Sequence, residues 1–263
     1  MILETIINAV KVRVEKDKEA IPYSAMKSMA ENLSSTTKDF PFEKAFCTNN
    51  MHFICEIKKA SPSKGVIDEV FPYLKIAKEY EDASATCISV LTEPDFFKGS
   101  DIYLTEIKRA VSIPLIRKDF IIDPYQIYQS KVIGADCILL ICSILDDNEL
   151  TQYLHLCDDL GLSVLVEAHD EKEVHRAVNC RARMIGVNNR DLRTFQVDIN
   201  NSIRLRKLVP ENIIFIAESG ISTNQDIKAL KEAKVNGVLV GETLMRAKNK
   251  SKMLEELRGV SKL

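Results

Sequence analysis

The sequence lacks several features that mark particular classes of protein. Among its 263 residues the charges nearly balance, and the formal net charge is −2. Without a basic surplus there is no electrostatic sign of nucleic-acid binding. No apolar run approaches the roughly 18 residues that a membrane-spanning helix needs. The sequence therefore predicts a protein that binds neither nucleic acid nor membrane.

Cysteine is present, but not in a pattern that forms disulfides. The seven Cys residues are an odd number, and no CxxC pair occurs. The chain starts with a charged amphipathic stretch rather than a signal peptide, so we expect reduced thiols and a cytoplasmic location. Four Cys residues lie in apolar runs and are expected to pack in the core as small hydrophobes: Cys55, Cys87, Cys137 and Cys142.

Motifs of three enzyme classes are also absent. No GxGxxG follows the first predicted strand, so a dinucleotide site is not indicated. Neither a GxSxG elbow nor a recognisable Cys/His pair supports acyl transfer. The segment EAHDEKEVH contains Glu167, His169 and His175, but it lacks the spacing of a zinc site. We therefore expect no metal, and we place the two His residues at the start and on the face of a helix.

Short β-branched runs alternate with amphipathic helical stretches from residue 52 onward. Apolar runs without polar alternation are typical of strands buried on both faces, and intervening helices indicate parallel strands. Eight such units predict a (β/α)8 TIM barrel, an α/β fold, with an open doubly wound sheet as the alternative. The runs begin near residues 52, 86, 114, 136, 163, 183, 213 and 237.

The start of the chain follows a different pattern. Residues 2–19 have a helical period, which Pro22 interrupts. Ser24 is a candidate cap for a second helix over 25–33. The segment SSTTKDFPF (34–42) is then expected to be a loop.

These patterns predict the domain organisation. We expect residues 1–45 to form a helical extension packed on the barrel, and residues 46–263 to form a single catalytic domain. The last three residues, Ser-Lys-Leu, match a peroxisomal address, a motif too short to carry weight alone.

Charged side chains follow several predicted strands where each strand ends, which is where barrel active sites lie. Glu56 and Lys58 point the same way, because strand side chains alternate between faces. Lys118, Glu167 and Arg190 end later strands, so three cations and two carboxylates are expected to converge. The cations favour an anionic substrate, and the carboxylates favour proton transfer. We expect the close cations to lower a lysine pKa toward neutrality, as a general acid requires.

Two glycine loops follow the last two predicted strands. AESGIS and VGETLM place Gly220 and Gly241 between a strand and a helix. Glycine lets backbone N–H groups approach an anion closely. Because barrels often hold a phosphate between these two loops, the sequence predicts a phosphorylated substrate.

The segment FICEIKKASPSKGVI resembles the signature of the indole-3-glycerol phosphate synthase family, the barrel enzymes of tryptophan biosynthesis. The resemblance extends over about residues 45–248, and the first 45 residues resemble the family's N-terminal extension. It implies conversion of 1-(2-carboxyphenylamino)-1-deoxyribulose 5-phosphate to indole-3-glycerol phosphate, CO2 and water, with no cofactor and no metal. Six further segments match the family in order and spacing: ISVLTEPDFFKGS, PLIRKDFIIDPYQI, VEAHDEKE, IGVNNRDL, AESGI and GVLVGETLM.

The resemblance also implies catalytic roles. Lys118 is implied to be the acid that activates the ketone for ring closure, with Glu167 facing it as proton acceptor or charge stabiliser. Lys58, paired with Glu56, is implied to hold the substrate carboxylate and to act as an acid in the dehydration, with Glu56 as a candidate base. How the steps divide among these four residues stays open.

Further residues are assigned to binding and orientation by the same resemblance. Asn188 and Ser219 are implied to orient the reacting groups, and Arg190 to support the charge network. Contacts to the phosphate, mainly through backbone N–H groups, are implied for Ser61, Gly220, Gly241 and Glu242. Four residues would line the pocket for the aromatic ring, with core packing as the alternative for each: Pro62, Phe97, Phe120 and Leu139.

Two other functions stay open at this point. Another phosphate-binding barrel enzyme of the same pathway would share the glycine loops but gives no reason for EIKKASPSKG. A catalytically silent barrel would be expected to lose one of the four charged residues. We expect a small phosphorylated molecule as the ligand, and a monomer or a weak homodimer.

Overall fold

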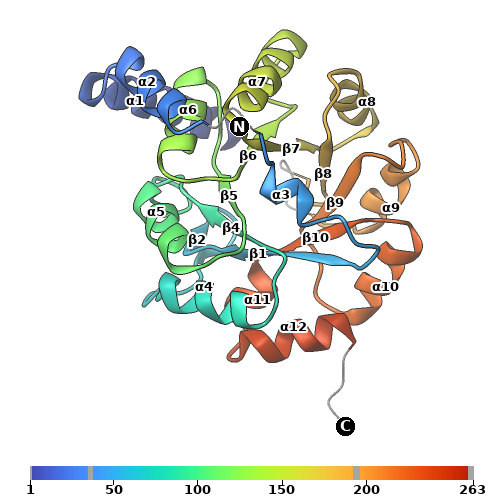
Figure 1. The fold of residues 1–263 in the computed structure, drawn as a ribbon. Helices are drawn as coiled ribbons and strands as arrows, with labels where there is room; N and C mark the ends of the chain where they lie inside the picture. The colour runs from blue at the N-terminus through green and yellow to red at the C-terminus, as the bar shows by residue number, and fades with distance from the viewer. Residues whose placement is uncertain (1, 35–37, 192–195, 260–263) are drawn as a thin grey trace.

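The computed structural model describes residues 2–34, 38–191 and 196–259, so the C-terminal Ser-Lys-Leu lies outside the described residues. Eight parallel strands form a closed barrel in which each strand pairs with the next along the chain and the last pairs with the first (Figure 1). The predicted (β/α)8 TIM barrel is therefore confirmed. Its strands are β1 (His52–Ile57), β4 (Cys87–Leu91), β5 (Leu115–Lys118), β6 (Cys137–Ile141), β7 (Ser163–Ala168), β8 (Met184–Asn188), β9 (Ile214–Glu218) and β10 (Gly237–Val240).

The expected strand starts agree with the observed ones to within one residue. The agreement has a physical cause, because nearly every strand residue is buried and the apolar run therefore marks the whole strand. The helices are α1 (Ile2–Ala20), α2 (Tyr23–Asn32), α3 (Pro41–Lys44), α4 (Tyr73–Asp82), α5 (Asp101–Ala110), α6 (Pro124–Val132), α7 (Asp147–Leu160), α8 (Glu171–Asn179), α9 (Asn200–Arg206), α10 (Asn224–Glu232), α11 (Glu242–Arg246) and α12 (Lys250–Arg258).

Two local expectations were wrong, and one element was not expected. Ser24 does not cap α2, because the helix starts at Tyr23 and Pro22 occupies the N-cap position with its carbonyl accepting from Met26. Residues 35–37 of the expected loop over 34–42 lie outside the described residues, and its expected end was wrong, since α3 begins at Pro41, a residue suited to the first helical turn. After β1 the chain also forms a small antiparallel hairpin that was not expected, made of β2 (Ala60–Ser61) and β3 (Gly65–Val66).

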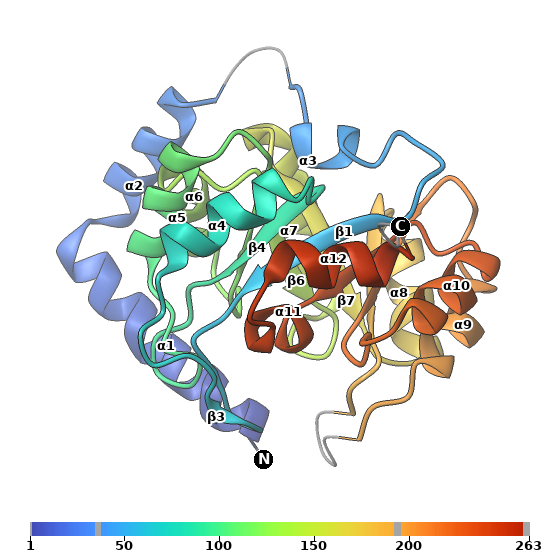
Figure 2. The ribbon, with the colours of Figure 1, turned by 90° about the horizontal axis from the view of Figure 1, so that it is seen from below.

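The interior of the barrel is an apolar core that is closed at the amino ends of the strands. Phe42 of α3 and the nearby Phe46 are buried together with inward-facing strand residues such as Ile54, Leu165 and Ile216. Figure 2 shows α3 at one end of the molecule, and β3 with the start of α1 at the opposite end. The open end of the barrel is therefore the end where the strands terminate.

Helices α1 and α2 pack along the side of the barrel beside α6 (Figures 1 and 2). The face of α1 that carries Ile6, Val10 and Val14 is buried. The Tyr125 hydroxyl of α6 donates to the backbone carbonyls of Asp17 and Ile21, 2.9 and 3.0 Å away. The chain before the barrel is thus attached to it by apolar packing and by hydrogen bonds.

The thiols behave as expected. All four Cys residues assigned to the core are buried, and burial raises the pKa of the Cys55 and Cys142 thiols to about 12. Within the described residues, no helix has both the length and the apolar character needed to cross a membrane.

Candidate active site

A cavity of about 530 Å³ opens at the carboxyl ends of the barrel strands. It is lined by all six candidate catalytic residues: Glu56, Lys58, Lys118, Glu167, Asn188 and Ser219. It is also lined by all nine candidate binding residues: Ser61, Pro62, Phe97, Phe120, Leu139, Arg190, Gly220, Gly241 and Glu242. The structure therefore brings together every residue that the sequence assigned to the site, while their individual roles stay predictions.

Lys118, the last residue of β5, lies between two carboxylates. Its Nζ atom is 2.9 Å from Oε2 of Glu167 and 3.0 Å from Oε2 of Glu218. Burial tends to lower the pKa of Lys118, but Glu167, Glu218 and Glu56 outweigh it and raise the pKa above its ordinary value. The expectation of a lowered lysine pKa was wrong, because carboxylates rather than cations surround this amine. Lys118 is therefore held in its protonated form.

Glu218 is a site residue to which the sequence assigned no role. It is the last residue of β9, with only 2% of its surface exposed, and it lines the cavity. Strand alternation was the available signal, since Ile216, two positions earlier, lies in the barrel interior. Ile116 and Leu165 have the same relation to Lys118 and Glu167.

The carboxylate of Glu218 differs electrostatically from that of Glu167. Burial raises the pKa of Glu218 to about 7, helped by the charges of Glu167 and Glu56 and opposed by Lys118. Among the described residues its Oε1 atom has no hydrogen-bond partner. A carboxylate with a pKa near neutrality and a free oxygen facing a cavity is suited to accept and return a proton.

Glu167 is held in its ionised form by two cations. Burial tends to raise its pKa, but Lys118 and His169 together bring the pKa below its ordinary value. Nε2 of His169 is 3.3 Å from Oε1 of Glu167, and Nδ1 is 3.1 Å from Oε2 of Glu173. Burial opposes protonation of His169, yet the two carboxylates raise its pKa to about 10. His169 does precede α8 as expected, but its contact with Glu167 was missed.

Glu56 and Lys58 form an ion pair, as their shared strand face predicted. Glu56 is in β1, and Lys58 lies one residue beyond its end. A side chain at Gly241 would collide with this pair, because a Cβ atom there would lie 2.2 Å from Oε2 of Glu56 and 3.1 Å from Nζ of Lys58. The ion pair therefore packs directly against the glycine loop that follows β10.

Polar residues at the ends of β8 and β9 and just after them complete the charged part of the cavity. Nδ2 of Asn188 is 3.4 Å from Oε1 of Glu167, and its Oδ1 accepts from the backbone N–H of Arg190. Ser219 and Gly220 have positive φ angles of 67° and 81°, which form a sharp turn at the end of β9. Asn189 ties this turn to β8 by donating to the carbonyl of Ser219. The two loops therefore present their polar groups in one place.

The cavity also has an apolar part. The rings of Phe97 and Phe120 lie with their centroids 6.1 Å apart. The cavity is also lined by α1, through Ile2, Leu3 and Ile6, a contribution that the sequence did not reveal. The helical extension therefore forms part of the pocket wall.

The backbone after β9 and β10 lines a further part of the cavity, at residues 220–222 and 241–243. The carboxylate of Glu242 faces two cations here, with Nε of Arg246 at 3.0 Å and Nζ of Lys64 at 3.5 Å. Burial tends to raise the pKa of Glu242, but these cations lower it overall. Across the ranges that the structure describes, no three His, Cys, Asp or Glu side chains are grouped so that they could hold a metal ion.

Comparison with solved structures shows how common this fold is. The chain resembles 3-hexulose-6-phosphate synthase from Salmonella typhimurium with a TM-score of 0.65 at 14% identity, over 80% of this chain and 98% of that one. It resembles thiamine phosphate pyrophosphorylase from Pyrococcus furiosus with a TM-score of 0.60 at 14% identity, over 81% and 95% of the two chains. At such low identity the likeness supports the barrel fold alone.

Sequence comparison is more specific. The family model described as "Indole-3-glycerol phosphate synthase" matches residues 3–257. The curated protein of that name from Ruminiclostridium cellulolyticum is 57% identical over 98% of this chain and 99% of its own length. Its namesake from Lachnoclostridium phytofermentans is 54% identical over 99% of this chain and its entire length. The protein that carries this barrel and this charged cavity therefore belongs to the indole-3-glycerol phosphate synthase family.

Proposed function

We propose that the chain performs the family's reaction with the side chains of this cavity. The substrate, 1-(2-carboxyphenylamino)-1-deoxyribulose 5-phosphate, carries a phosphate, a ketone and a carboxylated aromatic ring. The observation that carries the proposal is the position of Lys118 Nζ, 2.9 and 3.0 Å from two buried carboxylates in a cavity lined by both apolar and charged residues. Such a site can bind the aromatic ring and the anionic groups of the substrate in different places. Its lysine and carboxylates can donate protons to the substrate and accept protons from it.

In the first step the ring carbon that carries the carboxylate bonds to the ketone carbon. Lys118 donates its proton to the ketone oxygen, which becomes a hydroxyl group. Positive charge develops on the aniline nitrogen, and the ionised carboxylate of Glu167 stabilises it. The bond to the carboxylate then breaks, CO2 leaves, and its electron pair restores the aromatic ring.

In the second step the new five-membered ring loses water. Lys58 protonates the hydroxyl group, which leaves as water, and Glu56 orients Lys58 through their ion pair. Glu218 takes a proton from the neighbouring methylene carbon, and the electron pair forms the double bond of the indole. The pKa of Glu218, near 7, suits a base that must also give its proton back.

The remaining cavity residues bind the substrate. The backbone N–H groups of residues 220–222 and 241–243 receive the phosphate, with Ser61 beside them. Pro62, Phe97, Phe120 and Leu139 contact the aromatic ring. Asn188, Arg190 and Ser219 orient the reacting groups. Together these contacts hold the ketone next to Lys118.

A direct assay tests the function. The purified chain is mixed with the substrate in a buffer that contains a chelator, and indole absorbance and fluorescence are followed. Because the chain has no Trp, its own fluorescence adds little background. A rising indole signal supports the function and a reaction without a dissociable metal. If the substrate binds but no indole forms, the silent-barrel alternative replaces the proposal.

We further propose that the protein acts in the cytoplasm, with no cofactor, as a monomer or a weak homodimer. We also propose that residues 1–45 are an extension of a single catalytic domain, residues 46–263. Phe42, which is fully buried with the barrel core, supports an extension that cannot be removed without loss of stability. Light scattering of the full chain would test the oligomeric state. Unfolding of a chain that starts at residue 46 would test whether the extension is needed for stability.

A further inference from the structure

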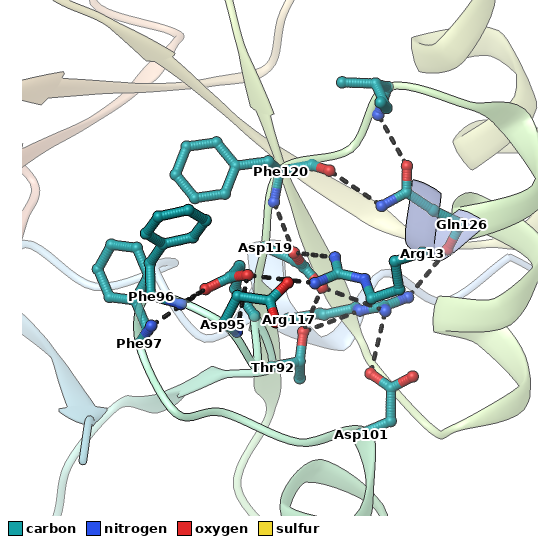
Figure 3. A network of polar contacts seen from close by, with 12 residues as sticks. Arg13, Thr92, Asp95, Phe96, Phe97, Asp101, Arg117, Asp119, Phe120 and Gln126 are labelled. Atoms are coloured by element: carbon teal, nitrogen blue, oxygen red, sulfur yellow. Dashed lines mark hydrogen bonds and ion pairs between the residues drawn. The ribbon is translucent and has the colours of Figure 1, made fainter. Parts of the chain in front are cut away.

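A second network of buried charges lies beside the catalytic cavity and reaches it through Asp119 (Figure 3). Arg13 of α1 is at its centre. Its Nη2 atom is 2.8 Å from Oδ1 of Asp119, and its Nη1 atom is 3.4 Å from Oε1 of Glu93. One guanidinium therefore bridges two loops that follow different strands.

Both carboxylates are buried, and both organise the backbone of their loops. The Glu93 side chain is 0% exposed and accepts from the backbone N–H groups of Asp95, Phe96 and Phe97, at 3.0, 2.8 and 3.0 Å. The Asp119 side chain is 1% exposed and accepts from the backbone N–H of Phe120 at 2.8 Å. Each carboxylate thus holds the backbone of an aromatic residue whose ring lines the catalytic cavity.

The rest of the network supports Asp119 but not Glu93. Thr92 donates to Oδ2 of Asp119 at 2.8 Å, and Arg117 lies 3.3 Å from the same oxygen. Arg117 is in turn fixed by contacts to other residues, among them Asp101. Over residues 2–34, 38–191 and 196–259, Arg13 is the one cation paired with Glu93. Arg13 therefore connects the Glu93 carboxylate to the charged network, while Thr92 connects the start of the same loop to Asp119.

The chemistry of arginine suits this bridge. A guanidinium presents several N–H donors in a fixed plane and can serve two carboxylates at once, whereas a lysine amine is a single point of charge. Burial tends to lower the pKa of Arg13, but Asp119, Glu93 and Asp101 raise it overall. Among the described residues, removing the cation would leave the buried Glu93 carboxylate without its cation and Asp119 with Arg117 alone, which is costly and would displace their loops.

Arg13 also lies on the helix whose start enters the cavity. Ile2, Leu3 and Ile6 line the cavity, about two to three turns before Arg13. The far half of α1 is attached separately, through Lys18 and Asp123, whose Nζ and Oδ2 atoms are 2.8 Å apart. The bridge made by Arg13 therefore holds together the three apolar parts of the pocket: the start of α1, the Phe97 loop and the Phe120 loop.

We propose that Arg13 is a positioning residue of the reaction, which fixes the ring-binding side of the pocket by joining the Phe97 and Phe120 loops to α1. It touches no reacting atom and acts through these two aromatic residues. The inference rests on the proposed contact of Phe97 and Phe120 with the aromatic ring.

The test compares Arg13→Met and Arg13→Lys with the wild-type chain and with Lys18→Met, which loosens the same helix at a site away from the cavity. Four quantities are measured: kcat and KM for the substrate, the Kd of indole-3-glycerol phosphate from its fluorescence, and the inhibition constant of inorganic phosphate. KM and the product Kd respond to the ring side of the pocket. The inhibition constant of phosphate reports on the phosphate side alone.

We expect Arg13→Met to raise KM and the product Kd about tenfold, since small displacements of positioning groups have effects of this size. The change in kcat is expected to be smaller. Arg13→Lys should lie between Arg13→Met and wild type, because it keeps the charge but not the bridge. Lys18→Met should leave KM within about twofold, and all variants should keep the phosphate inhibition constant of the wild type.

Several results would overturn the inference. One is a folded Arg13→Met variant with the KM and product Kd of the wild type. Another is a loss of phosphate binding in Arg13→Met as large as its loss of product binding. A third is an increase in KM in Lys18→Met equal to that in Arg13→Met. If Arg13→Met does not fold, Arg13→Lys with wild-type KM and product Kd would overturn it in the same way. Failure of the proposed function is distinguishable, because the wild-type chain would then form no indole at all.

Discussion

Gly186 leaves room for the carboxylate of Glu218. A Cβ atom on Gly186 would lie 2.2 Å from Oε1 of Glu218, closer than any unbonded contact allows. The two residues come from neighbouring strands, β8 and β9, in which Gly186 pairs with Ile216. The glycine is therefore explained by the side chain of the next strand rather than by its own backbone conformation.

Gly186→Ala is expected to displace the Glu218 carboxylate and to lower kcat by about tenfold or more, since Glu218 would no longer face the substrate. The free energy of unfolding should fall by about 1–3 kcal/mol, as for other overpacked cores. Urea unfolding and steady-state kinetics check both. In a Glu218→Ala background the same substitution should cost little stability, and an equal cost there would contradict the explanation.

Lys118→Met is expected to lower kcat by about a thousandfold, because general-acid catalysis contributes 10²–10⁴-fold. The variant should remain folded, since the neighbouring carboxylates can take up protons once the cation is gone. Circular dichroism and the indole assay test this, with Lys75→Met, at an exposed lysine of α4, as the control. A variant with normal turnover would remove Lys118 from its assigned role.

The raised pKa of Glu218 predicts how stability depends on pH. Between its unfolded pKa near 4.5 and its folded pKa of about 7, the folded chain binds the proton more tightly, so this group's contribution to stability falls as pH rises. Glu218→Gln should therefore gain more stability relative to wild type at pH 8 than at pH 5. Glu211→Gln is the control, because Lys234 lowers the pKa of Glu211, so the contribution of Glu211 to stability is complete at pH 5 and the same at pH 8. Equal differences at both pH values would show that the pKa of Glu218 is not raised.

His169→Asn tests the cation beside Glu167. The folded pKa of His169 is about 10 and its ordinary value is 6.5, so its stabilising contribution is complete below pH 6.5 and is lost as pH rises through 10. The variant should be less stable than wild type at pH 6, with a smaller difference near pH 10.

The same substitution is expected to lower kcat/KM about tenfold at neutral pH, because Glu167 loses one of the charges that keep it ionised. His175→Asn is a matched control, since His175 is on the exposed face of α8, 3.8 Å from Glu171. If both variants behaved alike in activity and in pH-dependent stability, His169 would have no role at the site.

Much of this protein could be predicted from local sequence. The strands were located to within one residue, because runs buried on both faces need continuous apolar side chains. The positions of Glu56, Lys58, Lys118 and Glu167 in the cavity followed from strand alternation and from the barrel rule that sites lie at strand ends. The family resemblance added further cavity residues, among them Asn188, Phe97 and Phe120.

Other features depend on which strands and helices become neighbours, and only the tertiary structure decided them. The expected lowering of a lysine pKa was wrong, because a pKa reflects the sum of nearby charges, and barrel closure places Glu218 as well as Glu167 beside Lys118. Arg13 lies 106 residues from Asp119 in the chain, yet the two are 2.8 Å apart. Sequence determines which side chain faces which way along one element, whereas distances between elements arise only when the barrel closes and α1 packs against it.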